Sequence, residues 1–235
     1  MKSRYPFEHP EIEALLDRLH GASSADKWRL APRLPFYVWA KLMGRATEGP
    51  AQHRIFYDVY SAVTPERGAL LYLITRAIIA KRVVEFGSSF GISTIYLATA
   101  VRDNLAASGN AEGRVIGSEM EPHKHSEATK NLQTAGLSGV ATIILGDALE
   151  TLRTVEGPVD MVFLDGRKDL YLPVFKLLEP KLRIGAVILA DNIFSFRKEV
   201  APYLEYVRLA KNGFASSSLK ISDGIELSIF QRCEK

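Results

Sequence analysis

Two short segments combine acidic, amide and amine side chains in a pattern that suits metal-assisted chemistry. The segment FLDGRKDLY contains Asp165 and Lys168, and the segment ILADNI contains Asp191 and Asn192. Carboxylate and amide oxygens are hard ligands of the type that Mg²⁺ prefers, and Mg²⁺ usually keeps open positions for water or substrate. Lys168 follows Asp165 by three residues, close enough to reach the same site. Alone, each residue would more often be a solvated loop charge or a helix cap, so the prediction depends on the group.

A second group of residues has the chemistry of a nucleoside-binding site. The segment EFGSSFGIS begins with Glu85 and carries Gly87 and Gly91, which allow a tight turn before a helix with free backbone N–H groups. Such a loop can hold an anionic or carboxylate group. Glu119 suits hydrogen bonds from a ribose diol, and Asp147 suits an adenine amine. Together these strand ends predict a nucleoside-containing cofactor.

The glycine spacing of the same loop separates two cofactor classes. Nicotinamide enzymes hold a pyrophosphate with G-x-G-x-x-G, whereas this loop has only Gly87 and Gly91. The spacing therefore argues against a dinucleotide.

Both groups need a scaffold that brings distant residues to one edge. From residue 82 the chain has short apolar runs, RVVEFG, RVIGSE, ATIILGD, VDMVFLD and GAVILAD, separated by stretches with helical spacing. Apolar runs without alternation are typical of strands covered on both faces. The order predicts an α/β fold, a doubly wound parallel sheet with right-handed crossovers, whose ligands bind beyond the carboxyl ends of the strands. The segment DGIELSIFQRC predicts a last strand reached through a turn.

Apolar residues at helical spacing predict amphipathic helices on both sides of this sheet. The stripes are Ile12, Leu15, Leu16, Leu19; Phe56, Val59, Tyr60, Val63; Leu70, Leu73, Ile74, Ala77, Ile78; Ala128, Leu132, Ala135; Tyr171, Val174, Phe175, Leu178; and Val200, Tyr203, Leu204, Val207. Between the first two lies APRLPFYVWAKLMG, which is too apolar for a free linker and must pack on the core or a substrate. We expect residues 1–64 to form an N-terminal helical appendage that caps the substrate, and residues 65–235 to form one domain.

Composition limits the classes of protein to which the chain can belong. Its 235 residues are 47% hydrophobic and 24% charged, which is ordinary for a globular protein. A net charge of +3 argues against a nucleic-acid surface, and a single cysteine, Cys233, allows no internal disulfide. No segment has the apolar length of a signal peptide or membrane span, so we expect a cytoplasmic protein with no membrane partner. The sequence leaves open whether the protein forms a homodimer.

The quoted motifs resemble those of a known family, the metal-dependent class I S-adenosylmethionine O-methyltransferases of the catechol and caffeoyl-CoA type. FLDGRKDLYLP and LADN are similar to the segments around the metal-binding Asp, the catalytic Lys and the Asp-Asn pair of the catechol enzymes. EFGSSFGIS and SEMEPH resemble their cofactor loop and ribose-binding acid. The resemblance covers about residues 63 to 230 and implies a Rossmann-like, seven-stranded sheet whose last strand is antiparallel.

The resemblance also implies a role for each site residue. Lys168 would be the general base, and Asp165, Asp191 and Asn192 would bind Mg²⁺ or another divalent cation. The implied contacts of S-adenosylmethionine are Glu85, Gly87 and Ser93 to its methionine part, Glu119 to the ribose, Asp147 and Ala148 to the adenine, and Val63 at the start of the resembling region. Two positions depart from the catechol pattern. Gly166-Arg167 replaces His-Trp, and Ser217 lies near the position of a Glu that accepts a second catechol hydroxyl.

The predicted reaction transfers a methyl group to a hydroxyl of a small, catechol-like aromatic acceptor, with secondary metabolism as one setting. A free phenol has a pKa near ~10, so it must be activated at neutral pH. A bound cation acidifies and positions the hydroxyl, and it also pushes a neighbouring amine toward the neutral form that a base needs. Phe194 and Phe196 follow the metal pair, and either wall an aromatic acceptor or belong to the core.

Two rival functions are kept. An RNA-modifying methyltransferase acting on a hydroxylated base would need a basic surface, and Lys27, Arg29, Arg33, Lys41 and Arg45 concentrate near the N-terminus. A binding module that keeps the cofactor site but lacks catalysis is less consistent with the presence of both the acidic groups and Lys168.

Overall fold

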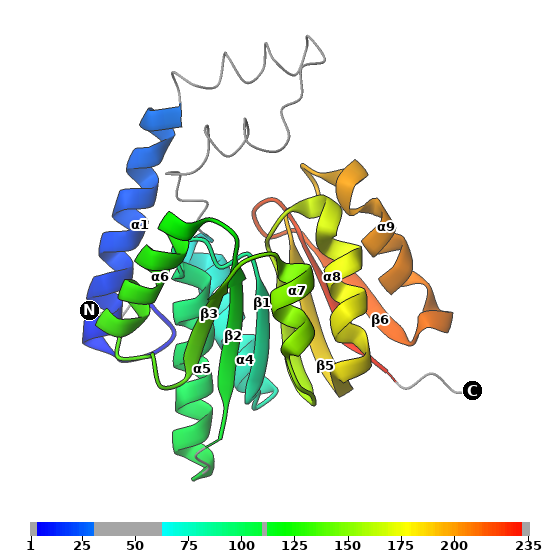
Figure 1. The fold of residues 1–235 in the computed structure, drawn as a ribbon, viewed down its shortest axis with the longest axis horizontal. Helices are drawn as coiled ribbons and strands as arrows, with labels where there is room; N and C mark the ends of the chain where they lie inside the picture. Colours follow the sequence, from blue (N-terminus) through cyan, green and yellow to red (C-terminus); the bar gives the residue numbers. More distant parts are fainter. Residues whose placement is uncertain (1–3, 31–62, 110–111, 232–235) are drawn as a thin grey trace.

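One seven-stranded sheet forms the centre of the computed structural model, which describes residues 4–30, 63–109 and 112–231 (Figure 1). The strand order is β3-β2-β1-β4-β5-β7-β6. β7 runs antiparallel to β5 and β6, and the other neighbouring strands are parallel, which confirms the predicted Rossmann-like sheet. The strands are β1 (Arg82–Phe86), β2 (Arg114–Glu119), β3 (Ala141–Leu145), β4 (Val159–Leu164), β5 (Leu182–Asp191), β6 (Phe214–Leu219) and β7 (Ile225–Phe230).

Helices cover both faces of the sheet, as the alternation of strand, helix and strand predicts. Neighbouring strand residues belong to different hydrophobic clusters: Val83 lies in one with Phe163, and Val84 lies in the other with Leu164. Because successive strand side chains point to opposite faces, these clusters are the two layers of the core. The first layer contains α1 (Pro10–Leu30), α4 (Pro65–Ala77), α5 (Ile92–Ser108) and α6 (Pro122–Thr134), and the second contains α7 (Ala148–Thr151), α8 (Tyr171–Leu178) and α9 (Arg197–Arg208).

The predicted apolar stripes of α6, α8 and α9 are buried, whereas that of α4 is confirmed only in part, because Leu70, Ile74 and Ile78 pack against the first core layer but Leu73 does not. Leu73 is 54% exposed, and the helix instead buries Leu71, Tyr72 and Thr75. The cause is the contact of α4 with α5. A Cβ atom on Gly68 would lie 2.3 Å from the Tyr96 ring, so α4 approaches α5 at its glycine and turns Leu73 outward.

The N-terminal helix α1 packs on the first layer of the core. Its predicted stripe, including Leu16 and Leu19, is buried in the same cluster as Ile95 and Tyr96 of α5. The segment APRLPFYVWAKLMG and the stripe from Phe56 to Tyr60 lie outside the described residues. Within the described ranges, no helix is long and apolar enough to cross a membrane. The division into residues 1–64 and 65–235 stays a prediction.

Candidate active site at the carboxyl edge of the sheet

The loops after β1 and β4 touch where the two central strands end. The backbone N–H of Asp165 donates to the carbonyl oxygen of Phe86 at 2.9 Å. Gly87 has a φ of 93°, and a Cβ on it would lie 2.5 Å from the Cα of Gly166. A Cβ on Gly166 would in turn lie 2.5 Å from the Phe86 ring. The departure at Gly166 is therefore accounted for, because Phe86 occupies the space that a larger residue would need.

Glu85, the predicted acid of β1, is a fully buried carboxyl group. It accepts hydrogen bonds from the Ser88 hydroxyl at 2.6 Å and from the Thr94 hydroxyl. Burial raises the pKa of Glu85 above its ordinary value, against the lowering effect of the Ser88, Ser93 and Thr94 hydroxyls. Its second oxygen, Oε1, has no hydrogen-bond partner among the described residues. The site thus holds a buried acceptor that a donor group of a ligand could satisfy.

Ser93 and Gly91 place the start of α5 beside this carboxyl group. Gly91 is the N-cap, with a φ of 81° and no side-chain cap, and Ser93 is buried in the first turn. The first backbone N–H groups of a helix lack partners within it and favour negative charge. The loop after β1 therefore offers donors from its backbone and a buried acceptor from Glu85, which together match an amino acid zwitterion.

Glu119 at the end of β2 joins this loop to the next strand end. Its Oε2 accepts the backbone N–H of Ser89 at 2.7 Å, and its Oε1 accepts that of Glu121 at 2.8 Å. A carboxylate has about four acceptor positions, so both oxygens can still take ligand hydroxyls. Sequence reasoning missed Gly117, whose added Cβ would lie 2.2 Å from the Ser88 hydroxyl oxygen. A glycine inside a strand pattern was the available signal.

The remaining predicted cofactor residues have structural partners. Asp147 caps α7 by accepting the backbone N–H of Leu149 at 2.9 Å, and Ala148 is buried in the second core layer. The N–H of Gly146 donates to the carbonyl of Glu119, which keeps this turn next to the end of β2. Val63 is buried in the first core layer, just before α4. The adenine role of Asp147 and Ala148 stays a prediction.

Lys168 lies in a small polar network between β4 and β5. Its Nζ donates to Asp165 Oδ1 at 2.9 Å and to the Tyr171 hydroxyl at 2.8 Å. The Tyr171 hydroxyl donates to the backbone carbonyl of Asp191 at 3.0 Å. Tyr171 was predicted only as a core residue of α8, and it also bridges the two strand ends. The predicted base and the predicted metal ligands are thus brought together.

Asp191 is fully buried at the last position of β5, and its two oxygens are both engaged. Oδ1 accepts the backbone N–H of Asn192 at 2.8 Å, and Oδ2 forms an ion pair with the guanidinium of Arg67 from α4. Burial, followed by the charge of Asp165, raises the pKa of Asp191, while Arg67 lowers it. Sequence reasoning missed Arg67, because no local pattern links residues 124 positions apart.

The two phenylalanines after the metal pair lie in different surroundings. Phe196 is 42% exposed, and its ring centroid lies 5.9 Å from Lys168 Nζ. Phe194 lines a hollow of about 600 Å³ with Arg197 and Ser218, between α9 and β6. Phe196 is therefore the ring placed beside the predicted base.

The other predicted departure, Ser217, lies away from this network. It is exposed on β6, where it pairs with Leu227 of β7, and β7 separates β6 from the strand that carries Asp191. Ser217 is therefore not brought together with Lys168 in the described structure.

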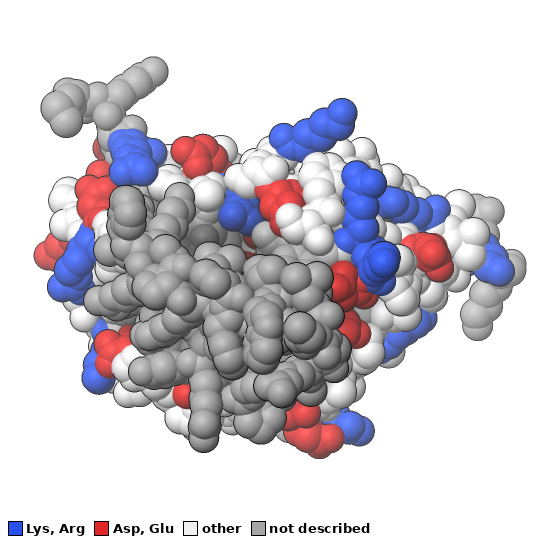
Figure 2. Space-filling model, turned by 90° about the horizontal axis from the view of Figure 1, so that it is seen from above, with Lys and Arg blue, Asp and Glu red and all other residues white. Residues whose placement is uncertain are grey.

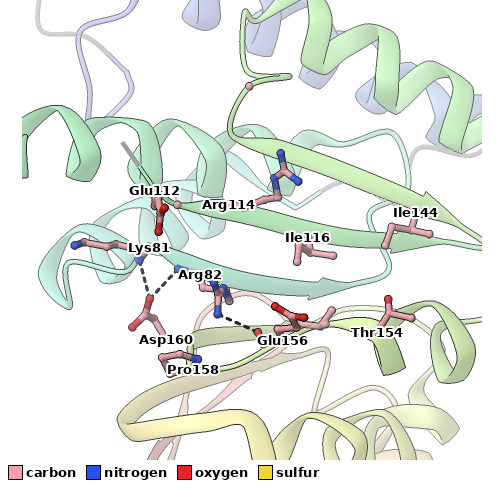
Figure 3. Close-up of a pocket in the computed structure, with 13 residues that line it drawn as sticks. Lys81, Arg82, Glu112, Arg114, Ile116, Ile144, Thr154, Glu156, Pro158 and Asp160 are labelled. Carbon is pink, nitrogen blue, oxygen red and sulfur yellow. Dashed lines mark hydrogen bonds between the residues drawn. The ribbon is translucent and has the colours of Figure 1, made fainter. Parts of the chain in front are cut away.

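A separate hollow of about 710 Å³ lies at the opposite edge of the sheet (Figure 3). Lys81, Arg82, Arg114 and Asp160 line it at the starts of β1, β2 and β4. Asp160 accepts the backbone N–H groups of Lys81 and Arg82 at 2.8 Å, and Arg82 donates to the carbonyl of Glu156 at 3.2 Å. These contacts tie the strand starts together, and no predicted site residue lines the hollow.

Charged side chains of both signs share the face seen from above. Figure 2 shows acidic and basic residues lying next to one another over the described part of this face. Of the basic residues that the RNA hypothesis needs, Lys27 and Arg29 lie at the end of α1, where side chains are not described. Arg33, Lys41 and Arg45 lie outside the described residues.

Known methyltransferases are similar to the chain in sequence and in fold. Residues 84–193 match the family model described as a methyltransferase domain. The catechol O-methyltransferase of Mycobacterium tuberculosis is 38% identical over 134 residues, covering 56% of this chain and 57% of that protein. That of Niastella koreensis is 35% identical over 136 residues, covering 56% and 58%. The chain thus aligns with little more than half the length of these relatives.

Among solved structures, the O-methyltransferase TomG from Streptomyces achromogenes, in complex with S-adenosylmethionine, is 26% identical with a TM-score of 0.65. The match covers 77% of this chain and 86% of that one. The chain is thus similar in sequence and fold to O-methyltransferases, among them catechol O-methyltransferases. The segment that matches the family model contains every predicted site residue except Val63, whereas Arg67 lies outside it.

The donor chemistry of the predicted ligand set fits a divalent cation. Among the described residues, no group of three His, Cys, Asp or Glu side chains could hold a metal. The predicted set instead joins the carboxylates of Asp165 and Asp191 to the amide of Asn192, which is an all-oxygen set suited to Mg²⁺. The charge of Asp165 contributes to the raised pKa of Asp191, so the two carboxylates lie within electrostatic reach, where a cation relieves their repulsion.

Proposed function

We propose that the chain is an S-adenosylmethionine-dependent O-methyltransferase that methylates a hydroxyl of a small, catechol-like aromatic molecule, with Mg²⁺ as the working cation. The observation that carries the proposal is the network of Lys168, Asp165, Tyr171 and Asp191, which joins the ends of β4 and β5. It lies next to the cofactor loop, because β1 and β4 are neighbours and their loops touch.

The cofactor half of the proposal rests on the buried carboxyl group of Glu85. Its unpartnered Oε1 suits the ammonium group of the methionine part, and backbone donors at the start of α5 suit the carboxylate. Glu119 suits the two ribose hydroxyls, since a carboxylate can accept both. The complex of TomG with S-adenosylmethionine supports the same cofactor for this chain.

In the catalytic half of the proposal, each of the remaining side chains has a role. Lys168 takes the hydroxyl proton of the acceptor at Nζ, while the acceptor oxygen attacks the sulfonium methyl group and the thioether leaves. Tyr171 holds Lys168 in place through its hydroxyl, 2.8 Å from Nζ. Asp165, Asp191 and Asn192 would hold the cation. When bound, the cation supplies Lewis acidity and a fixed position for the acceptor hydroxyl.

The aromatic class of acceptor is supported by Phe196 and by the relatives. The exposed ring of Phe196 lies beside Lys168, where it can contact a flat substrate. The curated relatives from Mycobacterium tuberculosis and Niastella koreensis are named catechol O-methyltransferases. In this proposal residues 1–64 cap the acceptor.

A panel of acceptors tests this function directly. The protein is incubated with S-adenosylmethionine, Mg²⁺ and catechol, caffeate, a monohydroxylated phenol or a transfer RNA, and methylated products are identified by mass spectrometry. We expect methylated catechol-type products and no methylated RNA. Methylation of RNA alone would favour the rival enzyme, and cofactor binding without any product would favour the binding module.

A further inference from the structure

Arg67 forms an ion pair with Asp191 in the described structure. It lies in the first turn of α4, two residues after Pro65, and its backbone N–H donates to the Thr64 hydroxyl at 3.4 Å. From there its side chain crosses to the end of β5, where Nη1 meets Asp191 Oδ2. The Arg67 side chain is only 12% exposed, and that of Asp191 is fully buried. The ion pair is therefore largely shielded from water.

A buried carboxylate at this position requires a positive partner. An uncompensated buried charge is strongly unfavourable, and Asp191 also feels the charge of Asp165. The other nearby cation, Lys168, donates to Asp165 and to the Tyr171 hydroxyl. Arg67 thus supplies to Asp191 the positive charge that a divalent cation would supply in the proposed function.

The guanidinium of Arg67 does not make all of its hydrogen bonds at this position. Its Nε is buried and has no hydrogen-bond partner among the described residues. Buried polar groups normally have partners, and leaving one without a partner costs free energy. Arg67 is therefore held mainly by the charge of Asp191, so a change on that carboxylate changes the environment of the arginine.

We propose that Arg67 is a built-in counter-cation that competes with the divalent cation for Asp191 and thereby sets the metal affinity of the site. This inference rests on the proposed function, because it assumes that the site takes a divalent cation. A guanidinium and a divalent ion on the same carboxylate repel one another, so binding of the ion releases the contact between Nη1 and Oδ2. Without the ion, Arg67 keeps Asp191 compensated.

Titration with Mn²⁺ tests the competition without any turnover. Mn²⁺ binding to wild type, Arg67→Gln and Arg76→Gln is measured by electron paramagnetic resonance, with melting temperatures recorded with and without the ion. Arg76 is a matched control, because it lies on the same helix and donates to Asn104 instead. We expect Arg67→Gln to bind Mn²⁺ at least tenfold more tightly than wild type and to melt at a lower temperature without metal. Its melting temperature should also rise more than that of wild type when Mn²⁺ is added. Arg76→Gln should keep the wild-type affinity for Mn²⁺.

A second measurement uses the wild-type protein and does not depend on the folding of Arg67→Gln. The side-chain Nε–H signal of Arg67 is followed by NMR during addition of Mg²⁺, and is assigned by its loss in Arg67→Lys. We expect this signal to shift as Mg²⁺ binds, whereas that of Arg76 stays in place.

The outcomes separate this inference from the proposed function. If wild type binds Mn²⁺ and Arg67→Gln binds it equally or more weakly, or if the Arg67 signal is unchanged at saturating Mg²⁺, Arg67 is only a structural partner and the competition is wrong. If neither wild type nor Arg67→Gln binds Mn²⁺, the competition and the Mg²⁺ dependence of the proposed function are both wrong.

Discussion

The ring of Phe86 fills the space that a side chain at Gly166 would occupy. This contact joins the cofactor loop after β1 to the loop that carries Asp165 and Lys168, because the backbone of Asp165 also donates to Phe86. Phe86 has a large side chain at the end of β1 and Gly166 has none in the loop after β4, whereas the catechol pattern has His at the second position. The packing of Phe86 on Gly166 is therefore one of the contacts that hold the cofactor half and the catalytic half of the site together.

This contact predicts strong coupling between the two positions. Gly166→Ala should lower the free energy of unfolding by about 1–3 kcal/mol, because its Cβ overlaps the Phe86 ring. In the double variant Phe86→Leu/Gly166→Ala the losses should not add, with an interaction energy of about 0.5–3 kcal/mol in urea unfolding. Gly139→Ala is the control, since a Cβ there meets nothing within 4 Å. Additive losses would mean that the overlap relaxes elsewhere.

Lys168→Met should fold normally and lose most methyl transfer. Lys168 begins a short 3₁₀ helix (Lys168–Leu170), and its replacement leaves no cavity in the core, while loss of a positioned base costs about 10²–10⁴-fold in rate. Turnover is measured at neutral pH, with melting temperature as the folding check. Lys176→Met is the control, because Lys176 pairs with Glu179 on the surface of α8. Full turnover by Lys168→Met would remove this residue from the mechanism.

Glu119→Gln should weaken binding of S-adenosylmethionine by about tenfold or more, since a hydrogen bond to a charged group contributes about 1.5–3 kcal/mol. The variant keeps one acceptor oxygen, whereas the wild-type carboxylate has two. In the wild type these two oxygens also accept the backbone N–H groups of Ser89 and Glu121. Calorimetry measures the affinity, and NADH should not compete with the cofactor. Glu127→Gln, which loses only a surface pair with Lys130, should bind like wild type. Equal affinities for all three proteins would contradict the ribose assignment.

Glu226, which lies opposite Ala190 on the strand next to β5, predicts a pH-dependent stability. Burial alone would raise its pKa, but hydrogen bonds from Arg208, Ser218 and Ser216 outweigh burial and lower it. A lowered folded pKa stabilises the protein above the unfolded value, near 4.5, and this stabilisation is lost as pH falls through the folded value. Urea unfolding from pH 6 to pH 3 should show a steeper decline for wild type than for Glu226→Gln. Parallel declines would exclude this contribution.

The sheet could be predicted because most of its strands are marked by an apolar run within their own sequence. Apolar runs such as VDMVFLD mark strands that are covered on both faces, and they are buried as expected in β4. β6 was not visible as an apolar run, because FASSSL is an edge strand with three consecutive serines. The face of α4 was predicted only in part. Leu70 and Ile74 pack against the core, but Leu73 faces outward because α4 meets α5 at Gly68 and Tyr96, a contact that the hydrophobic period of the helix does not reveal.

The candidate site was predictable only where its residues follow strands. Asp165, Asp191 and Glu119 each lie at or just after the end of a strand, and parallel strands bring such ends to one edge. Arg67 acts through a contact with a residue on another element, so its type suggested nothing specific, whereas Gly117 gave one signal, a glycine inside a strand pattern. Tyr171 was correctly predicted as core, yet its hydroxyl at the end of a buried ring links Lys168 to β5.

Metal dependence is the central claim, and removal of the metal tests it most directly. Protein freed of divalent ions with EDTA, and checked by elemental analysis, is assayed for methyl transfer to catechol and for binding of S-adenosylmethionine. We predict that turnover falls to background and returns with Mg²⁺, whereas cofactor binding largely survives, because its proposed contacts lie at the ends of β1 to β3. Asp191→Ala should reproduce the loss without recovery. Undiminished turnover by protein shown to contain no metal would contradict the account.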